Sequence, residues 1–272
     1  MTDICLFQTA LLGYLVCTVL YGVSLWGKRV LPAKAAAWLM LAALTFHTLS
    51  FAFRWSATGG GPAVGLYDAL SFFAWAMAAV YLALQLKTKT RVLGTFVAPV
   101  ITLVMVVASV GLGGAVAAPA GLRGSLVTLH VLLSVTGEAL FAVASCAGLM
   151  YLIQDGLLKK KRADQLSRLL PSLLDLDRIN HFCLSGGFPL LTLGVLAGSL
   201  WARIVWGSHW QWDPKQVWTL LAWGFYGFLL HQRLAIGWRG RRAARWSLAA
   251  FLILLILLIV GQPLFPTIHR FV

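Results

Sequence analysis

The chain has 272 residues, of which 60% are hydrophobic and 11% are charged, and its formal net charge is +14. A soluble chain of this composition would expose apolar surface that it could not cover, so the composition indicates a membrane protein. The basic residues stand in short loops between apolar runs and not along one aromatic-studded face, which argues against a nucleic-acid partner.

Long apolar runs predict an all-α polytopic membrane protein, with about eight transmembrane helices in one integral membrane domain, residues 1–272. Each run is near or above the length that crosses the hydrocarbon core of a bilayer. The predicted spans are 5–26, 35–54, 66–86, 92–112, 126–153, 181–204, 217–236 and 246–264. The first residues lack the basic region of a cleavable signal, so we expect the first span to stay in the bilayer.

The charge of the predicted loops alternates along the chain. The loops after the first, third, fifth and seventh spans hold most of the basic residues, namely Lys28, Arg29, Lys34, Lys87, Lys89, Arg91, Lys159, Lys160, Lys161, Arg162, Arg168, Arg178, Arg233, Arg239, Arg241, Arg242 and Arg245. The opposite loops hold few, namely Arg54, Arg123, Lys215 and Arg270. The positive-inside rule therefore predicts that both termini and residues 206–218 are extracytoplasmic.

The segment 155–180 is the one sizeable polar stretch of the chain. Leucines recur there at helical spacing among Lys and Arg, and Pro171 interrupts the pattern. This pattern predicts an interfacial amphipathic helix on the anionic cytoplasmic leaflet. Docking of a cytoplasmic partner is the alternative interpretation.

A tryptophan-rich stretch lies between the sixth and seventh predicted spans. It holds Trp206, Trp210, Trp212 and Trp218, and Gly207 and Pro214 break any regular pattern. Because indole rings favour the membrane interface, the stretch is expected to form a short platform at the membrane surface. A flat wall of indoles would suit a large planar apolar ligand such as a porphyrin. A plain aromatic belt that anchors the helices is the alternative.

Cysteines and common catalytic motifs give no sign of redox, nucleotide or ordinary hydrolase chemistry. The four cysteines form no C-x-x-C pair, and the chain has no phosphate-cradling glycine loop, G-x-S-x-G or H-E-x-x-H. An acid, Glu138, stands inside an apolar predicted helix. Such a group is costly in a membrane, and we expect a neutral carboxyl hydrogen-bonded to a neighbouring helix.

The predicted topology places the histidines at different depths in the membrane. His130 and His269 are expected at the outer membrane face, one before and one after the tryptophan stretch, where two imidazoles could ligate a haem iron from opposite faces. An ordinary hydrogen-bonding role is the alternative for each. His209 lies inside the stretch and could hold a haem propionate, although simple exposure explains it equally well.

His231 lies toward the cytoplasmic end of the seventh predicted span. An ionisable side chain at membrane depth is a functional candidate by default. Within this chain, His181 is the nearest candidate for a second ligand at that depth. His47 is expected to be structural.

The sequence of the tryptophan stretch resembles a motif of a known family. Trp-Gly-x-x-Trp-x-Trp-Asp-Pro-Lys, at 206–215, resembles the "WWD" signature of haem-handling membrane proteins. With Trp218, Trp223 and Leu-His-Gln-Arg at 230–233, the chain looks most like the CcsA (ResC) family of System II cytochrome c synthases. The runs 62–75 and 187–202 are also similar to that family. Gln216 stands where the family usually has Glu.

This resemblance implies a function, a cofactor and partners. Haem b would cross the membrane and be presented for covalent attachment to an apocytochrome c with a C-x-x-C-H motif. His130 and His269 match the two external haem ligands of the family by position, supported by Trp206, Trp210, Trp212 and Asp213. His231 matches a ligand of a second haem site within the membrane.

The resemblance further implies a ResB/CcsB-type membrane subunit that supplies the other ligand beside His231. Together the two would form part of a holocytochrome c synthase in a bacterial inner membrane, or in a thylakoid membrane if the protein is plastid-encoded. Three alternatives stay open: a HemX-type accessory protein of tetrapyrrole metabolism, a System I haem-delivery protein, and a non-catalytic membrane scaffold.

Overall fold

The structure is a computed structural model that describes residues 2–27, 29–58, 65–88, 90–111, 113, 124–160 and 169–264, with side chains up to residue 256. Every regular element in this part of the chain is helical. The elements are α1 (Thr2–Gly27), α2 (Val30–Thr58), α3 (Leu66–Thr88), the short 3₁₀ helix η1 (Arg91–Leu93), α4 (Gly94–Gly111), α5 (Ser125–Lys159), α7 (Leu173–Trp206), α8 (Pro214–Leu234) and α9 (Gly240–Leu264). The all-α prediction is confirmed.

Six of these helices, α1 to α5 and α7, are long and apolar enough to cross a membrane. The protein is therefore a polytopic membrane protein. The structure places α8 and α9 where the last two spans were predicted. They are less apolar over their described lengths, because α8 carries Lys215, His231 and Arg233, and α9 begins with several arginines.

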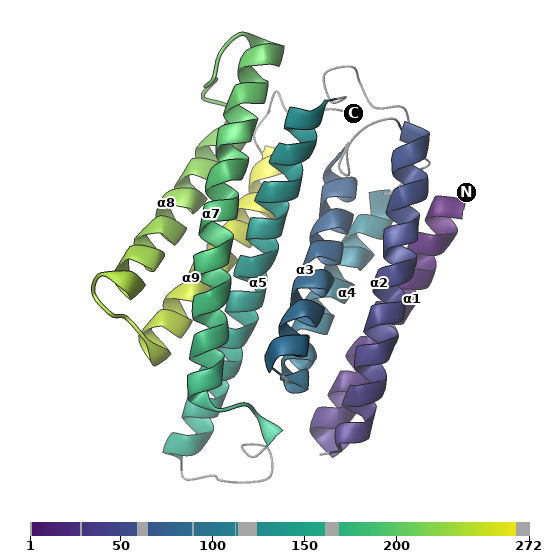
Figure 1. Cartoon of the computed structure of the whole chain (residues 1–272), viewed down its shortest axis with the longest axis vertical. Helices are drawn as coiled ribbons and strands as arrows, with labels where there is room; N and C mark the ends of the chain where they lie inside the picture. The colour runs from purple at the N-terminus through teal and green to yellow at the C-terminus, as the bar shows by residue number, and fades with distance from the viewer. Residues whose placement is uncertain are drawn as a thin grey trace.

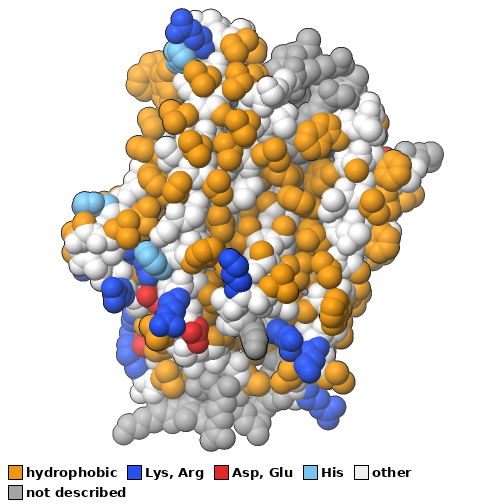
Figure 2. Space-filling model, in the orientation of Figure 1, with side chains coloured by type: hydrophobic (Ala, Val, Ile, Leu, Met, Phe, Trp, Pro, Cys, Tyr) orange, Lys and Arg blue, Asp and Glu red, His pale blue; other side chains and the backbone are white. Residues whose placement is uncertain are grey.

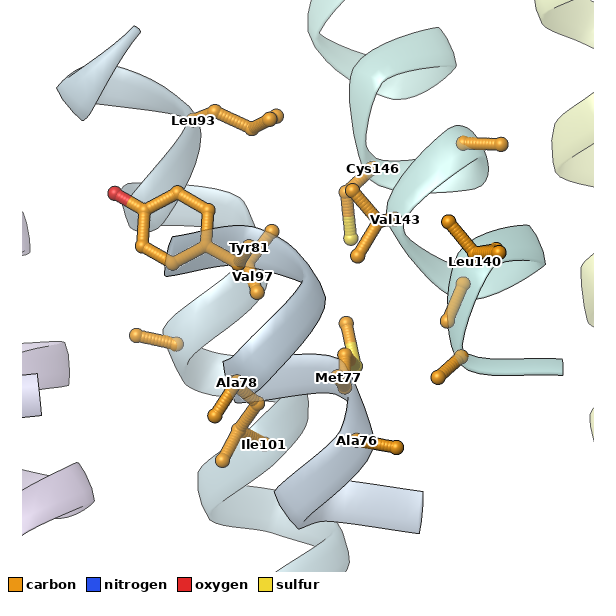
Figure 3. Close-up of a cluster of buried hydrophobic side chains, with 14 of the residues drawn as sticks. Ala76, Met77, Ala78, Tyr81, Leu93, Val97, Ile101, Leu140, Val143 and Cys146 are labelled. Atoms are coloured by element: carbon orange, nitrogen blue, oxygen red, sulfur yellow. The ribbon is translucent and has the colours of Figure 1, made fainter. Parts of the chain in front are cut away.

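The helices form two groups that lie side by side (Figure 1). One group contains α1 to α4, and the other contains α5, α7, α8 and α9. Helix α5 joins them through its contacts with α3 and α4. Figure 3 shows this junction, where Ala76 and Met77 of α3 lie near Leu140 and Val143 of α5 in the buried apolar core. The residues at this boundary are fully or almost fully buried, which makes the two groups one packed domain.

Glycines allow the closest helix contact in the second group, between α5 and α7. A Cβ on Gly137 would stand 2.9 Å from the Gly187 carbonyl oxygen, and one on Gly194 would collide with Ser134 Oγ. Small residues let two backbones approach closely in lipid, and Gly194 and Gly198 stand one turn apart on α7. The resulting close pair of helices is the frame to which the residues of the candidate site are attached.

The polar segment 155–180 is divided between two long helices. Residues up to Lys159 continue α5, and α7 begins at Leu173, two residues after Pro171. The Ser172 Oγ accepts a hydrogen bond from the backbone N–H of Asp175 at 3.1 Å, which caps α7. Residues 161–168 lie outside the described residues. The amphipathic leucine pattern therefore belongs, at its two ends, to extensions of membrane helices.

His47 occupies the core of the first group of helices. Its side chain is 0% exposed, with Nε2 3.0 Å from Ser71 Oγ and Nδ1 3.4 Å from Tyr14 OH. Its ring also stacks on Phe51. These contacts account for both ring nitrogens and give His47 the structural role that was expected of it.

Candidate functional site

The tryptophan stretch forms a loop between α7 and α8. Helix α7 ends at Trp206 because Gly207 takes a left-handed backbone conformation, φ 76°. Helix α8 begins at Pro214, and the Asp213 carboxylate accepts a hydrogen bond from the Lys215 N–H at 3.0 Å. Asp213 is therefore an N-cap of α8, and it is 5% exposed. The two helix ends thus fix the start and the finish of the loop.

The loop is also braced from within. Gln216 Oε1 accepts a hydrogen bond from the Gln211 backbone N–H at 2.9 Å. Ser208 Oγ donates to the Trp210 carbonyl at 2.9 Å. A Glu side chain at position 216 would also offer an oxygen to the Gln211 N–H. Gln in place of Glu therefore keeps the hydrogen-bond acceptor that the loop uses.

The indole rings of the loop are arranged edge to face and do not form the single flat wall expected from the sequence. Trp210 and Trp212 have centroids 5.5 Å apart at 87°, and Trp206 packs against Trp201 at 5.0 Å and 71°. Edge-to-face pairing is a preferred geometry of aromatic rings, which explains the difference. The Trp212 side chain is 78% exposed and therefore available to a ligand.

Trp212 also has a backbone conformation that few bulky residues adopt. Its φ is 53°, in the left-handed region. Such a conformation costs a non-glycine residue on the order of 1–3 kcal/mol, and the surrounding structure must enforce it. The residues on either side of Trp212 are held by hydrogen bonds, Gln211 to Gln216 Oε1 and Asp213 to the Lys215 N–H. In this conformation the Trp212 side chain is exposed.

His130 lies on the second turn of α5, with one ring nitrogen anchored to α7. Its Nδ1 is 2.7 Å from the Gly194 carbonyl oxygen. A carbonyl can only accept, so Nδ1 carries the proton and the lone pair of the neutral ring is on Nε2. A Cβ on Gly198 would stand 2.6 Å from the same ring. The glycines of α7 therefore make room for the imidazole as well as for close helix contact.

His209 is exposed, and its ring nitrogens contact two residues near the end of α7. Arg203 Nη1 donates to Nε2 at 3.0 Å, and Nδ1 lies 3.2 Å from the Ser199 carbonyl oxygen. Both ring nitrogens are thus engaged, which makes His209 a poor iron ligand. The exposed Arg203 guanidinium beside it adds a positive charge that could meet a ligand carboxylate. His269, the predicted partner of His130, lies outside the described residues.

His231 and His181 lie at a similar depth on antiparallel helices. Arg233 of α8 contacts both Asp177 and Asn180 of α7, so positions 231 and 181 are each within one helical turn of the same level. His231 is exposed on the side of the bundle and His181 is half-buried, with Nδ1 3.5 Å from Ser185 Oγ. An exposed imidazole at this depth is accessible to lipid or to a second membrane chain.

Glu138 has a charged neighbour that the sequence alone did not indicate. It is half-buried on α5 and interacts electrostatically with Lys215 on the first turn of α8. Lys215 also interacts with His130 and with Asp213. The expected hydrogen bond of a neutral carboxyl to a neighbouring helix stays a prediction, and Lys215 is an additional charged group near it. Sequence separation hid this pair, since 77 positions divide two residues that the fold brings together.

The donor set fits a haem better than a bare metal ion. Among the residues that the structure describes, no three His, Cys, Asp or Glu side chains gather as a metal-ion site would require. A haem iron has its equatorial positions filled by the porphyrin and takes only axial ligands from the protein. A single imidazole such as His130, with Nδ1 anchored and with no hydrogen bond to Nε2 from any described residue, suits that role.

Comparison with known families decides the classification. The profile of the family described as "Cytochrome C assembly protein" matches residues 63–269 of the chain. The chain belongs to the cytochrome c assembly protein family.

Individual members of the cytochrome c assembly family match over most of their length. The "Cytochrome c biogenesis protein CcsA" of Pyropia yezoensis is 29% identical, over 89% of this chain and 88% of its own. The protein of the same name from Porphyra purpurea is 30% identical with the same coverage. That of Microcystis aeruginosa is 28% identical, over 82% of this chain and 83% of its own. The resemblance to CcsA is confirmed.

A solved structure shares the fold. The "Cytochrome c Heme Lyase CcmF" superposes with a TM-score of 0.68 at 15% identity, over 97% of this chain and 46% of that chain. The chain thus spans less than half of that larger protein. At this identity the likeness concerns the arrangement of helices alone.

Proposed function

We propose that this member of the cytochrome c assembly family acts in cytochrome c biogenesis by carrying haem b through the membrane and presenting it on the extracytoplasmic side. The acceptor would be an apocytochrome c with a C-x-x-C-H motif. The observation that carries the proposal is His130, whose Nδ1 is fixed by Gly194 at 2.7 Å and whose Nε2 is left for iron. Helix α5 begins at the end of the bundle that carries the tryptophan loop (Figure 1), and His130 is on the second turn of this helix.

Different residues at the outer end would bind different parts of the haem. His130 and His269 would be the axial ligands, and Trp206, Trp210 and Trp212 would contact the ring through their apolar faces. Asp213 would act indirectly, because it caps α8 and so fixes the loop. Arg203, with His209 bonded to it, would meet a propionate. When bound, haem supplies the vinyl groups to which the cysteine thiols add, and the protein contributes their orientation.

A second haem site would lie at the depth of His231. The exposure of this side chain supports a site that is completed from outside the chain, by a ligand on a ResB/CcsB-type subunit. His181, at a similar depth, is the alternative ligand within the chain. Together the two subunits would form a holocytochrome c synthase. Haem would be taken up here and released toward the tryptophan loop.

The proposed topology has eight spans in one membrane domain, with both termini and residues 206–218 outside and residues 155–180 in the cytoplasm. Figure 2 supports it, because Lys and Arg gather mainly over one half of the molecule, away from the α7–α8 loop. Cytoplasmic loops carry an excess of such residues. The membrane would be a bacterial plasma membrane, or a thylakoid membrane if the protein is plastid-encoded.

The test is the spectrum of the purified protein. We expect bound haem b with a low-spin signature of two axial histidines, and we expect His130→Ala and His269→Ala each to lower haem occupancy or convert the haem to high spin. Leu129→Ala is the matched control, since Leu129 neighbours His130 on α5 but its side chain is 46% exposed. Unchanged spectra in both histidine variants would refute the outer site. Wild-type protein without haem would favour a scaffold.

A further inference from the structure

Arg233 is a buried cation at the end of α8. Its side chain is 3% exposed. Nη1 donates to Asn180 Oδ1 at 2.9 Å, and Nη2 donates to Asp177 Oδ2 at 3.1 Å and to the Asp177 carbonyl at 3.3 Å. All three acceptors are on α7. The guanidinium thus has a fixed position and a fixed plane against the neighbouring helix.

The acceptors of Arg233 are themselves held by two further helices. Asp177 Oδ1 accepts from the Gly240 N–H at 2.9 Å, at the start of α9. Asn180 Nδ2 donates to the Ala144 carbonyl of α5 at 2.7 Å and to Ser247 Oγ of α9 at 2.9 Å. Four helices therefore meet in one hydrogen-bonded network around a single guanidinium. Removing one partner from such a network leaves another buried polar group unpaired.

The network fixes the rotation of α8 about its axis. Two residues that are two positions apart in an α-helix point about 200° apart around its axis. Because Arg233 is bound inside the bundle, His231 points almost the opposite way and is exposed. Tyr226 and Leu229, each 1% exposed, share the buried face with Arg233.

The same network stabilises the last turn of α8. The helix ends at Leu234, and beyond His231 the intrahelical ladder is short, with the Ala235 N–H donating to the His231 carbonyl at 2.8 Å. Terminal turns fray readily unless tertiary contacts hold them. Arg233 provides the contact for the turn that contains His231.

We propose that Arg233 is the positioning residue of His231: it directs the imidazole out of the bundle, toward a ligand bound on the membrane-facing side. The forked guanidinium is required, since it reaches two side chains and one carbonyl of α7 at once, and an ammonium group cannot match that geometry. The part that concerns a ligand rests on the proposed function, in which His231 binds haem. The part that concerns orientation does not.

The orientation is measured without haem. A spin label is attached at residue 231 in a His231→Cys, Cys5→Ser protein, in which the remaining cysteines are buried. We expect a label that collides with membrane-dissolved oxygen more than with a water-soluble nickel chelate. Arg233→Gln should raise its mobility and change that ratio, and Arg233→Lys should do so partly. A label at Leu193, 52% exposed on α7, should not respond.

Two further variants keep the result interpretable. Arg245→Gln removes an exposed arginine of α9 and should leave the label at residue 231 unchanged. Arg233→Gln leaves the Asp177 charge unpaired, so Asp177→Asn with Arg233→Gln provides a version without that charge. If the label keeps its wild-type mobility and collision ratio in this double variant, the proposal is overturned.

The consequence for the ligand is measured separately, in protein that retains His231. Loss of a residue that orients a metal ligand typically costs about 10- to 100-fold in affinity, so haem that depends on His231 should be lost in Arg233→Gln by about that factor. Haem that depends on His130 should remain. If the label reorients and the haem bound through His231 is unchanged, the positioning role stands and the assignment of His231 as a haem ligand fails.

Discussion

Gln216 and His130 illustrate how single residues of the site depend on partners that are distant or unexpected. Gln216 braces the tryptophan loop through its contact with the Gln211 N–H at 2.9 Å. His130 depends on a carbonyl 64 positions away, that of Gly194. The sequence predicts the position of His130 at the outer end of a helix, since charge and hydropathy give its depth. It does not predict Gly194 as its partner, because backbone acceptors leave no signature in a sequence.

Substitutions at Gln216 should separate hydrogen bonding from charge. Gln216→Glu keeps an acceptor for the Gln211 N–H, so we expect haem affinity at the outer site to stay near wild type. Gln216→Leu removes the acceptor, and the loss of one such hydrogen bond, about 0.5–1.5 kcal/mol, should weaken haem binding by up to about tenfold. Titration of haem into the stripped protein measures both. A loss in Gln216→Glu as large as that in Gln216→Leu would contradict the prediction, because the Glu variant keeps the acceptor for the Gln211 N–H.

At the scale of the elements, the pattern of apolar residues predicts where helices cross the membrane better than where they end. The predicted span 181–204 corresponds to α7, Leu173–Trp206, and the span 126–153 corresponds to α5, Ser125–Lys159. Hydropathy reports the part in lipid, whereas helix ends are set by caps such as Ser172 and by Gly207. The direction of each helix face is also absent from the pattern, which is why the contact between Gly198 and His130 could not be predicted.

The interface between α5 and α7 provides a test of that contact. A Cβ at position 198 would stand 2.6 Å from the His130 ring, so Gly198→Ala should displace the imidazole and reduce haem bound per folded molecule. Gly224→Ala is the matched control, because nothing lies within 4 Å of a Cβ there. We expect a reduction of severalfold in the first variant and none in the second, measured by absorbance of haem against protein. Wild-type haem content in Gly198→Ala would contradict the placement of His130.

At the scale of the whole molecule, the two groups of helices differ in what they contain. All the described candidate residues are in α5, α7, α8 or the α7–α8 loop. They are His130, His181, His209, His231 and the tryptophans. The first group supplies packing through α3 and α4 (Figure 3) and a polar core around His47. The number of groups and their junction could not be predicted, since apolar spans look alike in sequence and their pairing depends on side-chain shape.

The orientation of the whole molecule is open to direct labelling. Cysteines introduced at Ser208 and at Arg239 stand at the α7–α8 loop and the α8–α9 turn, and three of the four native cysteines are buried. In intact cells a membrane-impermeant maleimide should label residue 208 and should reach residue 239 only after the membrane is opened, because Arg clusters remain on the cytoplasmic side. Labelling of residue 239 in intact cells would reverse the proposed topology.

The hairpin of α1 and α2 lies outside the part of the chain that the family profile matches. The family match begins at residue 63, after the end of α2, and so leaves this hairpin out. Its buried side chains, among them Tyr14, Tyr21 and Met40, belong to the apolar core that it shares with α3 and α4. The hairpin also has polar contacts of its own, since His47 Nε2 lies 3.0 Å from Ser71 Oγ of α3 and Arg54 of α2 pairs with Asp68 of α3 at 2.6 Å. The consequence is that this hairpin is joined to the matched region by both apolar packing and a buried charge pair, so cutting the chain after α2 would expose Asp68 and the apolar face of α3 together.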